Sequence, residues 1–417
     1  MMTIIKHYIF QGRIMSGPFK GIRVLELTST VSGPFAGMML ADQGAEVIKV
    51  EPPGLGDLAR FMGTIKDGMG AMFSTLNRNK KCICLDFKND EDLAVLKKLV
   101  STTDVIIENY RPGIVKKLGI DYETLVKINP DLIYCSISGY GQSGPYQEKK
   151  VYDPLIQGTV GIPNAQSDQF PELIRTIIYD KVTGLTSAQA ISAALFQRER
   201  GEGGQYLPIS MMESALYYNW PDLMINHTFE EGGVSLGELA DLFEVYETSD
   251  GAVVIIIIAA DEVFINFCSL FELNLHEHEK YSNLASRLIH RKELTDEINA
   301  VTRKYSTSDL VSIMDKAGIS ASICNQLEDV HQDPQVIDQG SIVTIDHPDL
   351  GKMRMPKPPV NFKGQGIFPR SLAPILGHDN KEVLSSIGVE DDTIRRMEER
   401  EQQNRELLAA LMPTNQE

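Results

Sequence analysis

The chain has 417 residues, of which 42% are hydrophobic and 23% are charged, so it has an ordinary globular composition and enough length for two domains. Its 40 basic and 57 acidic residues give a net charge of −17, which argues against binding to nucleic acids or anionic membranes. The five cysteines include no C-x-x-C pair, so neither a zinc site nor a disulfide framework is indicated, and a cytoplasmic location is expected.

The first segment, residues 1–16, is apolar but short, and it lacks the small-residue cleavage site of a signal peptide. We interpret it as an N-terminal extension, with Met15 as a candidate native start. The apolar run 253–260 holds eight residues, far fewer than the roughly 20 that span a membrane. Neither secretion nor membrane insertion is therefore predicted.

From Ile22 onward, apolar runs of strand length alternate with segments of helical periodicity. Such alternation predicts an α/β fold with a parallel sheet and helices on both faces, in which ligands bind at the carboxyl ends of the strands. Asn89 is the expected cap of one of the helices. The predicted strands are 22–27, 46–50, 82–85, 105–107, 132–137 and 174–178, and the predicted helices are 33–43, 90–100, 122–128, one starting near 153, and 183–198.

The character of the sequence changes beyond about residue 240. A strand at 253–258 is followed by polar helices, which predicts a second, smaller α+β domain at 240–330 after a large domain at 17–239. The remainder, 331–417, has strand-like pieces at 342–345 and 353–359. It ends in a helix at 393–411 that is so charged that we expect it to be a solvated surface helix.

Two common ligand motifs fit poorly. The turn Ser32–Gly37 follows the first predicted strand like a dinucleotide-binding turn, but it lacks one glycine of G-x-G-x-x-G and contains a proline. Close helix packing at its glycines is the better interpretation, although Glu51 stands where a ribose-binding acid would. The pair His276 and His278 lies in a polar stretch without further ligands, so no metal site is predicted.

Histidine is absent between His7 and His227, so any base in this part must be a carboxylate, a lysine or a tyrosine. Asp180 stands between the predicted strand 174–178 and the next helix. Aspartate at such a place commonly caps the helix. The position also suits a carboxylate nucleophile, because apolar neighbours desolvate it, the helix dipole keeps it ionised, and N–H groups near Gly184 are available to an oxyanion. The residues alone leave both roles open.

Several long motifs occur in order between about residues 17 and 388. They are GIRVLELTSTVSGPFAGMMLADQGAEVIKVEPPGLGD, NRNKKCICLDFKN, DVIIENYRPGIVKKLGIDYETLVKINPDLIYCSISGYGQSGPY, YDPLIQG, D-x-x-x-G at 180–184, and APILGHDNKEVL. In these motifs the chain resembles the class III coenzyme A transferases (CaiB/BaiF type), a family that also contains the α-methylacyl-CoA racemases.

The resemblance implies a CoA transferase that moves CoA from an acyl-CoA donor to a small carboxylic acid. The family's aspartate, matched here by Asp180, attacks the thioester to give a mixed anhydride, and the returning thiolate converts it into an aspartyl-CoA thioester. Asp153 is then the structural carboxylate of the Y-D motif. No permanently bound cofactor is implied, because the CoA thioester is itself the substrate.

The resemblance also implies which residues contact CoA. The list is Thr30, Val31, Ser32, Leu85, Lys88, Asn109, Tyr110, Lys117 and Lys150. Lys117 replaces an arginine of some relatives and loses its bidentate fork, and Pro52 replaces a phosphate-binding arginine. A group of basic residues in an otherwise acidic chain favours a phosphate site: Arg78, Lys80, Lys81, Lys88, Lys116, Lys117 and Lys150.

Two departures from the family pattern bear on the activity. Tyr152 stands where racemases carry a histidine, so an imidazole–carboxylate pair for α-proton transfer is missing and the transferase is favoured. Val31 replaces a glutamine of the formyl/oxalyl branch, which argues against a small dicarboxylate such as oxalate and for a less polar acyl group. The glycine-rich lid of that branch is reduced to Gly232, Gly233 and Gly237.

The family fold implies a Rossmann-like large domain built from both chain ends, so that 331–417 returns to it, and a small middle domain. It also implies an interlocked homodimer with the site between the large domain of one chain and the small domain of the other. Racemase activity is the alternative to CoA transfer, and a dinucleotide-binding or non-catalytic protein is the more distant one.

Overall fold

The computed structural model describes residues 17–167, 169–235, 237–360, 362 and 368–411, so the extension predicted at 1–16 lies outside the described residues. The chain forms two compact units. The larger unit comprises the described residues up to Tyr218 and from Ser341 onward, and the smaller unit is Asn219–Gly340. None of the helices within these ranges has the length and apolar character needed to cross a membrane.

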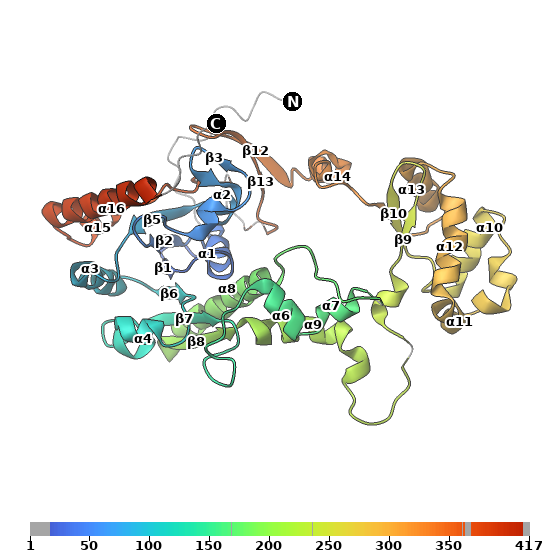
Figure 1. The fold of residues 1–417 in the computed structure, drawn as a ribbon, viewed down its shortest axis with the longest axis horizontal. Helices are drawn as coiled ribbons and strands as arrows, with labels where there is room; N and C mark the ends of the chain where they lie inside the picture. Colours follow the sequence, from blue (N-terminus) through green and yellow to red (C-terminus); the bar gives the residue numbers. More distant parts are fainter. Residues whose placement is uncertain (1–16, 168, 236, 361, 363–367, 412–417) are drawn as a thin grey trace. The chain divides into compact units, whose positions relative to one another are not determined.

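Six parallel strands form the centre of the larger unit, in the spatial order β5-β2-β1-β6-β7-β8 (Figure 1). In chain order they are β1 (Arg23–Leu27), β2 (Glu46–Glu51), β5 (Lys80–Cys84), β6 (Val105–Glu108), β7 (Ile133–Ser138) and β8 (Gln205–Ser210). The order reverses between β1 and β6, and open parallel sheets bind ligands outside the carboxyl ends of the strands at such a point. The predicted α/β fold with a parallel sheet is confirmed.

The prediction of a strand at 174–178 is wrong, and the sixth strand is β8. The amide of Gln157 accepts from the Ile174 N–H at 2.9 Å and donates to the carbonyl oxygens of Ile174 and Thr176, both at 3.3 Å. These backbone groups are thus bonded to a side chain rather than to a strand. β8 lies at the edge of the sheet and pairs only with β7, which is where a strand can accommodate Pro208.

Helices cover both faces of this sheet because alternate strand residues point to opposite faces. Leu25 belongs to the core beneath α3 (Asp90–Val100), α15 (Asn380–Ser386) and α16 (Asp391–Leu411). Its neighbour Val24 belongs to the core beneath α1 (Ser32–Asp42) and α8 (Tyr179–Gln197). α3 is capped as predicted, because the Asn89 side chain accepts from the N–H groups of Glu91 and Asp92. The C-terminal segment therefore completes the layer over one face.

The remaining elements of the larger unit are short. The hairpins are β3 (Ile65–Lys66) with β4 (Met69–Gly70), and β12 (Ile342–His347) with β13 (Gly351–Pro356). The helices are α2 (Ala71–Leu76), α4 (Ile114–Leu118), α5 (Tyr122–Leu125), α6 (Asp153–Thr159) and α7 (Ile162–Ala165), and α9 (Met211–Leu223) continues from the larger unit into the smaller.

The smaller unit combines an antiparallel sheet with helices. The sheet has the order β11-β10-β9, from strands Ala321–Ile323, Ala252–Ile255 and Val245–Glu247. Phe264 and Phe267 of α10 are fully buried in its core. The helices are α10 (Asp261–Leu270), α11 (Leu284–Ile289), α12 (Arg291–Thr302), α13 (Thr307–Lys316) and α14 (Pro334–Asp338).

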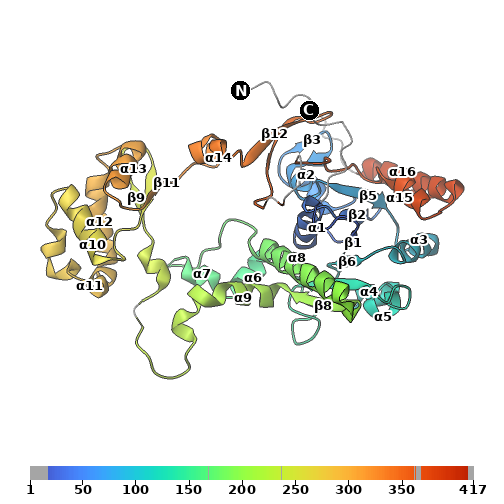
Figure 2. The same ribbon diagram turned by 180° about the vertical axis from the view of Figure 1, so that it is seen from behind.

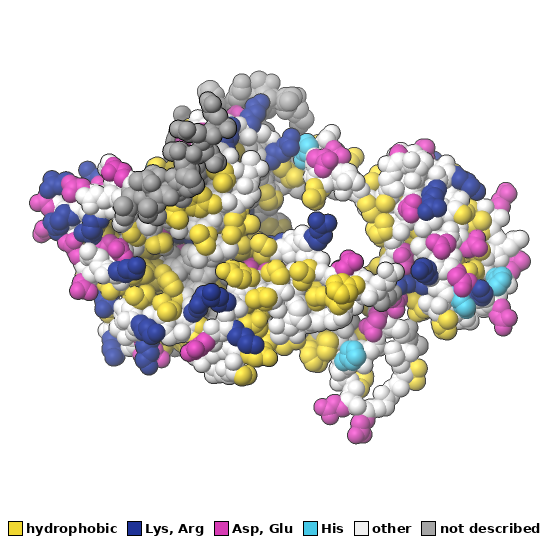
Figure 3. Space-filling model, in the orientation of Figure 1, with side chains coloured by type: hydrophobic (Ala, Val, Ile, Leu, Met, Phe, Trp, Pro, Cys, Tyr) yellow, Lys and Arg dark blue, Asp and Glu magenta, His cyan; other side chains and the backbone are white. Residues whose placement is uncertain are grey.

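The C-terminal helix α16 is only partly the solvated helix that its charge predicts. Basic and acidic side chains are interspersed over its outer surface (Figure 3), where Arg395 pairs with Asp392. Its other face is buried, with Ile394 and Met397 in the core beneath α3. Arg396 also bonds Glu91 of α3 at 2.6 Å, so helix-to-helix ion pairs supplement the apolar contact.

Candidate active site

Asp180 lies in the first turn of α8 and is half-buried, so it sits at the start of a helix but not at the end of a strand. Its side chain is not the cap of this helix. The Oδ2 atom of Asp153 accepts from the N–H groups of Tyr179 at 2.5 Å and of Asp180 at 3.1 Å. Asp153 therefore satisfies two of the free donors at the start of α8 and leaves the Asp180 carboxylate available for other chemistry.

The Asp153 side chain is itself fixed by a neighbour in α6. It begins α6, is buried, and accepts from Nε2 of Gln157 at 2.7 Å through its other oxygen. The same Gln157 bonds the backbone of 174–176, as described above. The segment that leads into Asp180 is thereby fixed to α6 at its start and at its end.

Burial is the main influence on the Asp180 carboxyl and raises its pKa to about 6. The nearby Asp153 carboxylate raises this pKa too, while the hydroxyl and the backbone N–H of Ser32 lower it by hydrogen bonding to the charged form. At neutral pH the group is thus mostly ionised. It is nevertheless more basic than an ordinary aspartate, which favours attack on a carbonyl carbon.

Gly184 explains how Ser32 comes within reach of Asp180. The helices α1 and α8 lie side by side in both views (Figures 1 and 2). A Cβ on Gly184 would stand 2.7 Å from the Ser32 carbonyl oxygen and 3.0 Å from Cβ of Phe35. Glycine therefore permits the close approach of the two helices at the end where Ser32 and Asp180 meet.

The oxyanion role expected for N–H groups near Gly184 does not fit this geometry. Gly184 lies beyond the first four residues of α8, Tyr179–Val182, so its N–H falls within the helical hydrogen-bond ladder. The N–H groups of Tyr179 and Asp180 bond Asp153, and that of Val182 bonds the Ile178 carbonyl at 2.9 Å. The donors that do contact the Asp180 carboxylate are the hydroxyl and the backbone N–H of Ser32.

The loop after β1 leads directly into Ser32. Thr30 in this loop has φ 71°, a left-handed conformation that is rare for a β-branched residue. The amide of Asn109, which follows β6, accepts from the Ser29 N–H at 3.0 Å and donates to the Ser29 carbonyl oxygen at 2.9 Å. Asn109 thus joins the loops on either side of the point where the strand order reverses, and it does so through backbone atoms.

Most residues predicted to contact CoA follow the carboxyl ends of the strands. Thr30, Val31 and Ser32 come after β1, Leu85 and Lys88 after β5, Asn109 and Tyr110 after β6, and Lys150 in the loop after β7, whereas Lys117 lies in α4. The side chains of Val31 and Leu85 are buried in apolar clusters. The side chains of Lys88, Lys117 and Lys150 are exposed. Burial raises the pKa of Tyr110 to about 12, so its hydroxyl stays protonated.

The predicted basic group is wrong for three of its members. Arg78 pairs with Asp42 at 2.7 Å, and Lys81 pairs with Glu46 at 2.8 Å. Lys80 is fully buried and pairs with Glu26 at 2.7 Å. These side chains are bonded within the protein and are not placed to bind phosphate, whereas Lys88, Lys116, Lys117 and Lys150 remain exposed.

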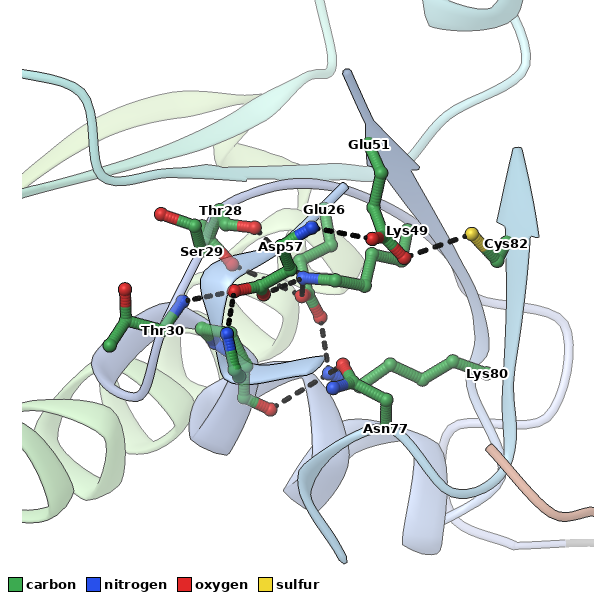
Figure 4. A network of polar contacts seen from close by, with 12 residues as sticks. Glu26, Thr28, Ser29, Thr30, Lys49, Glu51, Asp57, Asn77, Lys80 and Cys82 are labelled. Carbon is green, nitrogen blue, oxygen red and sulfur yellow. Dashed lines mark hydrogen bonds and ion pairs between the residues drawn. The ribbon is translucent and has the colours of Figure 1, made fainter. Parts of the chain in front are cut away.

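A buried cluster of six charged side chains, which we call the ion cluster, contacts the β1 loop; Figure 4 labels all of its members except Arg60. Its members are Glu26, Lys49, Glu51, Asp57, Arg60 and Lys80. No motif in the sequence marks this cluster. The available signal was the occurrence of charged residues inside otherwise apolar strands, Glu26 in β1 and Lys49 in β2.

Metal ligands are not grouped in the part of the chain that the structure describes, where no set of three or more His, Cys, Asp or Glu side chains could hold an ion.

Comparisons with known proteins all point to one family. A family model described as CoA-transferase family III matches residues 19–380.

The succinyl-CoA:glutarate CoA-transferase of Mus musculus is 31% identical over 89% of this chain and 86% of its own length. The succinyl-CoA–D-citramalate CoA-transferase of Chloroflexus aurantiacus is 33% identical over 90% and 96%. Among solved structures, a CAIB/BAIF family protein from Brucella suis is 31% identical, covers 89% of this chain and 100% of that one, and superimposes with a TM-score of 0.79.

Proposed function

The chain belongs to CoA-transferase family III and is a class III acyl-CoA:carboxylate CoA-transferase, and from this premise we propose that Asp180 is the nucleophile that carries the transfer. The supporting observation is a half-buried carboxylate with a pKa raised to about 6 that is relieved of capping α8 by Asp153. A partly desolvated, basic carboxylate that does not cap its own helix is what covalent catalysis by aspartate needs.

In the proposed mechanism, a carboxylate oxygen of Asp180 attacks the thioester carbonyl of the donor. The C–S bond breaks, CoA leaves as a thiolate, and an acyl–aspartyl anhydride remains. The thiolate then attacks the aspartyl carbonyl and releases the donor acid, which leaves Asp180 as a CoA thioester. An acceptor carboxylate repeats the two steps in reverse, forming acceptor-CoA and the free Asp180 carboxylate. No net proton is consumed.

The hydrogen-bond donors of Ser32 are well suited to this cycle. They bond the ionised Asp180. When Asp180 attacks a carbonyl carbon, the same donors would be close enough to stabilise the oxygen that becomes negatively charged. The cycle consumes no net proton and therefore needs no imidazole base, and the sequence between His7 and His227 contains no histidine.

For CoA itself, we propose the carboxyl edge of the sheet. The β1 loop with Thr30, Val31 and Ser32 would lie along the pantetheine arm, together with Leu85, Asn109 and Tyr110. The exposed Lys88, Lys117 and Lys150 would meet the phosphates as point charges, which suits a negatively charged ligand on an acidic protein. We also propose the interlocked homodimer of the family, with the site completed by the smaller unit of the partner.

For the donor, we propose succinyl-CoA as the first candidate. The mouse and Chloroflexus relatives both use succinyl-CoA with a second carboxylic acid, according to their names. The sequence alone favoured a less polar acyl group because of Val31. That side chain is buried in an apolar cluster, so its influence on a polar acyl group would be indirect.

The test is the intact mass of the protein after incubation with a panel of acyl-CoAs and trapping with hydroxylamine or borohydride, for wild type and Asp180→Ala. We expect a mass change that maps to residue 180 with at least one donor and is absent from the variant. An adduct that persists in Asp180→Ala would refute the proposed nucleophile.

The same incubations in D₂O distinguish the racemase. Exchange of the α-hydrogen of a 2-methylacyl-CoA without any acceptor acid would indicate racemase chemistry. We expect none, because Tyr152 occupies the position of the racemase histidine and its side chain is exposed.

A further inference from the structure

Thr30 is the one β-branched residue with a left-handed backbone among the non-glycine residues that the structure describes. In this conformation the Cβ substituents crowd the backbone, so Thr30 adopts it only when the surroundings impose it. Strained backbones of this kind concentrate at functional sites. In this protein, hydrogen bonds to the backbone of the β1 loop impose the left-handed conformation on Thr30.

The ion cluster bonds the backbone of the loop at several successive points (Figure 4). Nζ of Lys49 donates to the Thr28 carbonyl oxygen at 2.8 Å, and Oδ1 of Asp57 accepts from the Thr30 N–H at 2.9 Å. Nζ of Lys80 donates to the Pro34 carbonyl oxygen at 2.9 Å. Asn109 bonds Ser29 as well. The segment from Thr28 to Pro34, which comprises the β1 loop and the first residues of α1, is thus held at both ends and in its middle.

Asp57 is the member of the cluster that bonds the strained residue itself, and it is rigidly held. It is buried, its N–H donates to Oε2 of Glu51 at 2.7 Å, and its Oδ2 pairs with Lys49 at 2.9 Å. The oxygen that bonds Thr30 also accepts from the Ala59 N–H at 2.9 Å, which caps the short 3-10 helix η2 (Leu58–Phe61). A group fixed by so many partners can hold a neighbour in an unfavourable conformation.

The position of Thr30 matters because Ser32, two residues later, bonds Asp180. A rotation at Thr30 would turn the following backbone and carry the Ser32 donors away from the carboxylate. We propose that Asp57 is a positioning residue for the transfer reaction: it holds Thr30 in the left-handed conformation and thereby sets Ser32 beside Asp180. This inference rests on the proposed role of Asp180.

A double-mutant cycle between residues 30 and 57 tests the proposal. Glycine adopts a left-handed backbone without strain, so a loop with glycine at position 30 depends less on Asp57. We expect Asp57→Ala to lower kcat and the rate of adduct formation by about tenfold or more. The loss should be at least about threefold smaller when Asp57→Ala is introduced into Thr30→Gly. An equal loss in both backgrounds would overturn the proposal.

Two further variants separate positioning from general damage to the fold. Asp57→Asn keeps an oxygen for the Thr30 N–H, while its new amide NH₂ faces the Lys49 ammonium, so it should restore part of the kcat lost in Asp57→Ala and cost stability. Asp42→Ala removes another buried carboxylate of the same unit, which pairs with Arg78 away from the loop. It should lower the thermal midpoint without lowering kcat, and an equal loss of kcat in Asp42→Ala would count against the proposal.

If Asp57→Ala does not fold, the same contact can be removed from the other side. Thr30→Pro eliminates both the N–H and the left-handed conformation and leaves the ion cluster intact. It should have at least about tenfold lower kcat than Thr30→Gly, which lacks the same side chain but keeps both features. Equal kcat values for the two would overturn the proposal.

Asp180→Ala, assayed in parallel, distinguishes a failure of the proposed nucleophile from a failure of the proposed role of Asp57. If it still forms the adduct, the proposed nucleophile is wrong whatever the cycle shows. If it forms none and residues 30 and 57 show no coupling, the role of Asp57 alone is refuted.

Discussion

Oδ2 of Asp153 lies 3.1 Å from the backbone nitrogen of Asp180 and 2.5 Å from that of Tyr179. One aspartate thus caps the helix that presents another. The arrangement separates two roles that the sequence attaches to a single residue, helix cap and nucleophile. It also places a second negative charge where it raises the pKa of the Asp180 carboxyl.

Asp153→Asn should lower the pKa of Asp180, because the neighbouring negative charge disappears while one oxygen remains to cap α8. The acid limb of the kcat/KM profile should then move to lower pH. We also expect a loss of about 1–3 kcal/mol in the free energy of unfolding, because the new amide group opposes the Gln157 donor. Asp121→Asn, at the cap of α5, is the matched control and should leave the pH profile where it is.

The activity of the wild-type enzyme should rise with pH through about 6 and level off near neutrality. The attacking form of Asp180 is the carboxylate, and its pKa in the folded enzyme is raised to about 6. The kcat/KM of the free enzyme, measured between pH 5 and 8 with a non-titrating donor, checks this. A flat profile across pH 6 would mean that another group or step controls the rate.

Asp180→Asn should make the protein more stable at neutral pH, by about 1–3 kcal/mol. The pKa of the Asp180 carboxyl is about 6 in the folded state against an ordinary 3.8, so between these values the folded protein binds the proton more tightly. The stability contributed by this group is therefore present below about pH 4 and lost as the pH rises through 6. Urea unfolding at pH 5 and pH 7.5 should show a larger gain for the variant at pH 7.5.

Gly184→Ala should cost about 1–3 kcal/mol and reduce kcat, because its Cβ would stand 2.7 Å from the Ser32 carbonyl oxygen and force α8 away from α1. Gly158→Ala in α6 is the matched control. A Cβ there would meet nothing within 4 Å, so the change should be neutral or stabilising. Chemical denaturation and steady-state kinetics of both variants provide the comparison.

Alkylation of the cysteines should leave the CoA-transfer reaction intact. Cys82, Cys84, Cys135 and Cys268 are buried, and burial raises the pKa of each thiol, that of Cys135 to about 12. Iodoacetamide at pH 7.5 should therefore label mainly the half-buried Cys324, as mass spectrometry would reveal. The alkylated protein should still form the acyl adduct, whereas loss of the adduct would point to an attacking thiol.

The parallel sheet and its helices were predictable because their strands are continuous apolar runs, as in Val105–Glu108, and because Asn89 marks a helix start. The exception, 174–178, shows the limit of such patterns: its apolar residues precede a helix, and a glutamine side chain takes the backbone bonds that a strand would make. β8 was missed because Pro208 interrupts the pattern, and only an edge position tolerates it.

Asp180 was predictable as a candidate from its neighbours and from family resemblance, but its surroundings were not. Lys80 looks like a surface lysine in the sequence, yet it is fully buried against Glu26. Glu26 belongs to β1 and Lys80 to β5, and the two meet only because both strands pair with β2. The contact of Asp57 with Thr30 joins residues in separate loops, and no spacing rule predicts it.

The ion cluster contains three carboxylates and three cations, so its formal charge sums to zero inside a strongly acidic protein. A single change of charge at any member leaves an uncompensated ion in a medium that solvates it badly. Single substitutions at these positions should therefore cost stability, and a second change that restores the charge balance should recover part of it. Laboratory evolution toward new acyl donors should therefore change these six codons less often than codons for exposed residues.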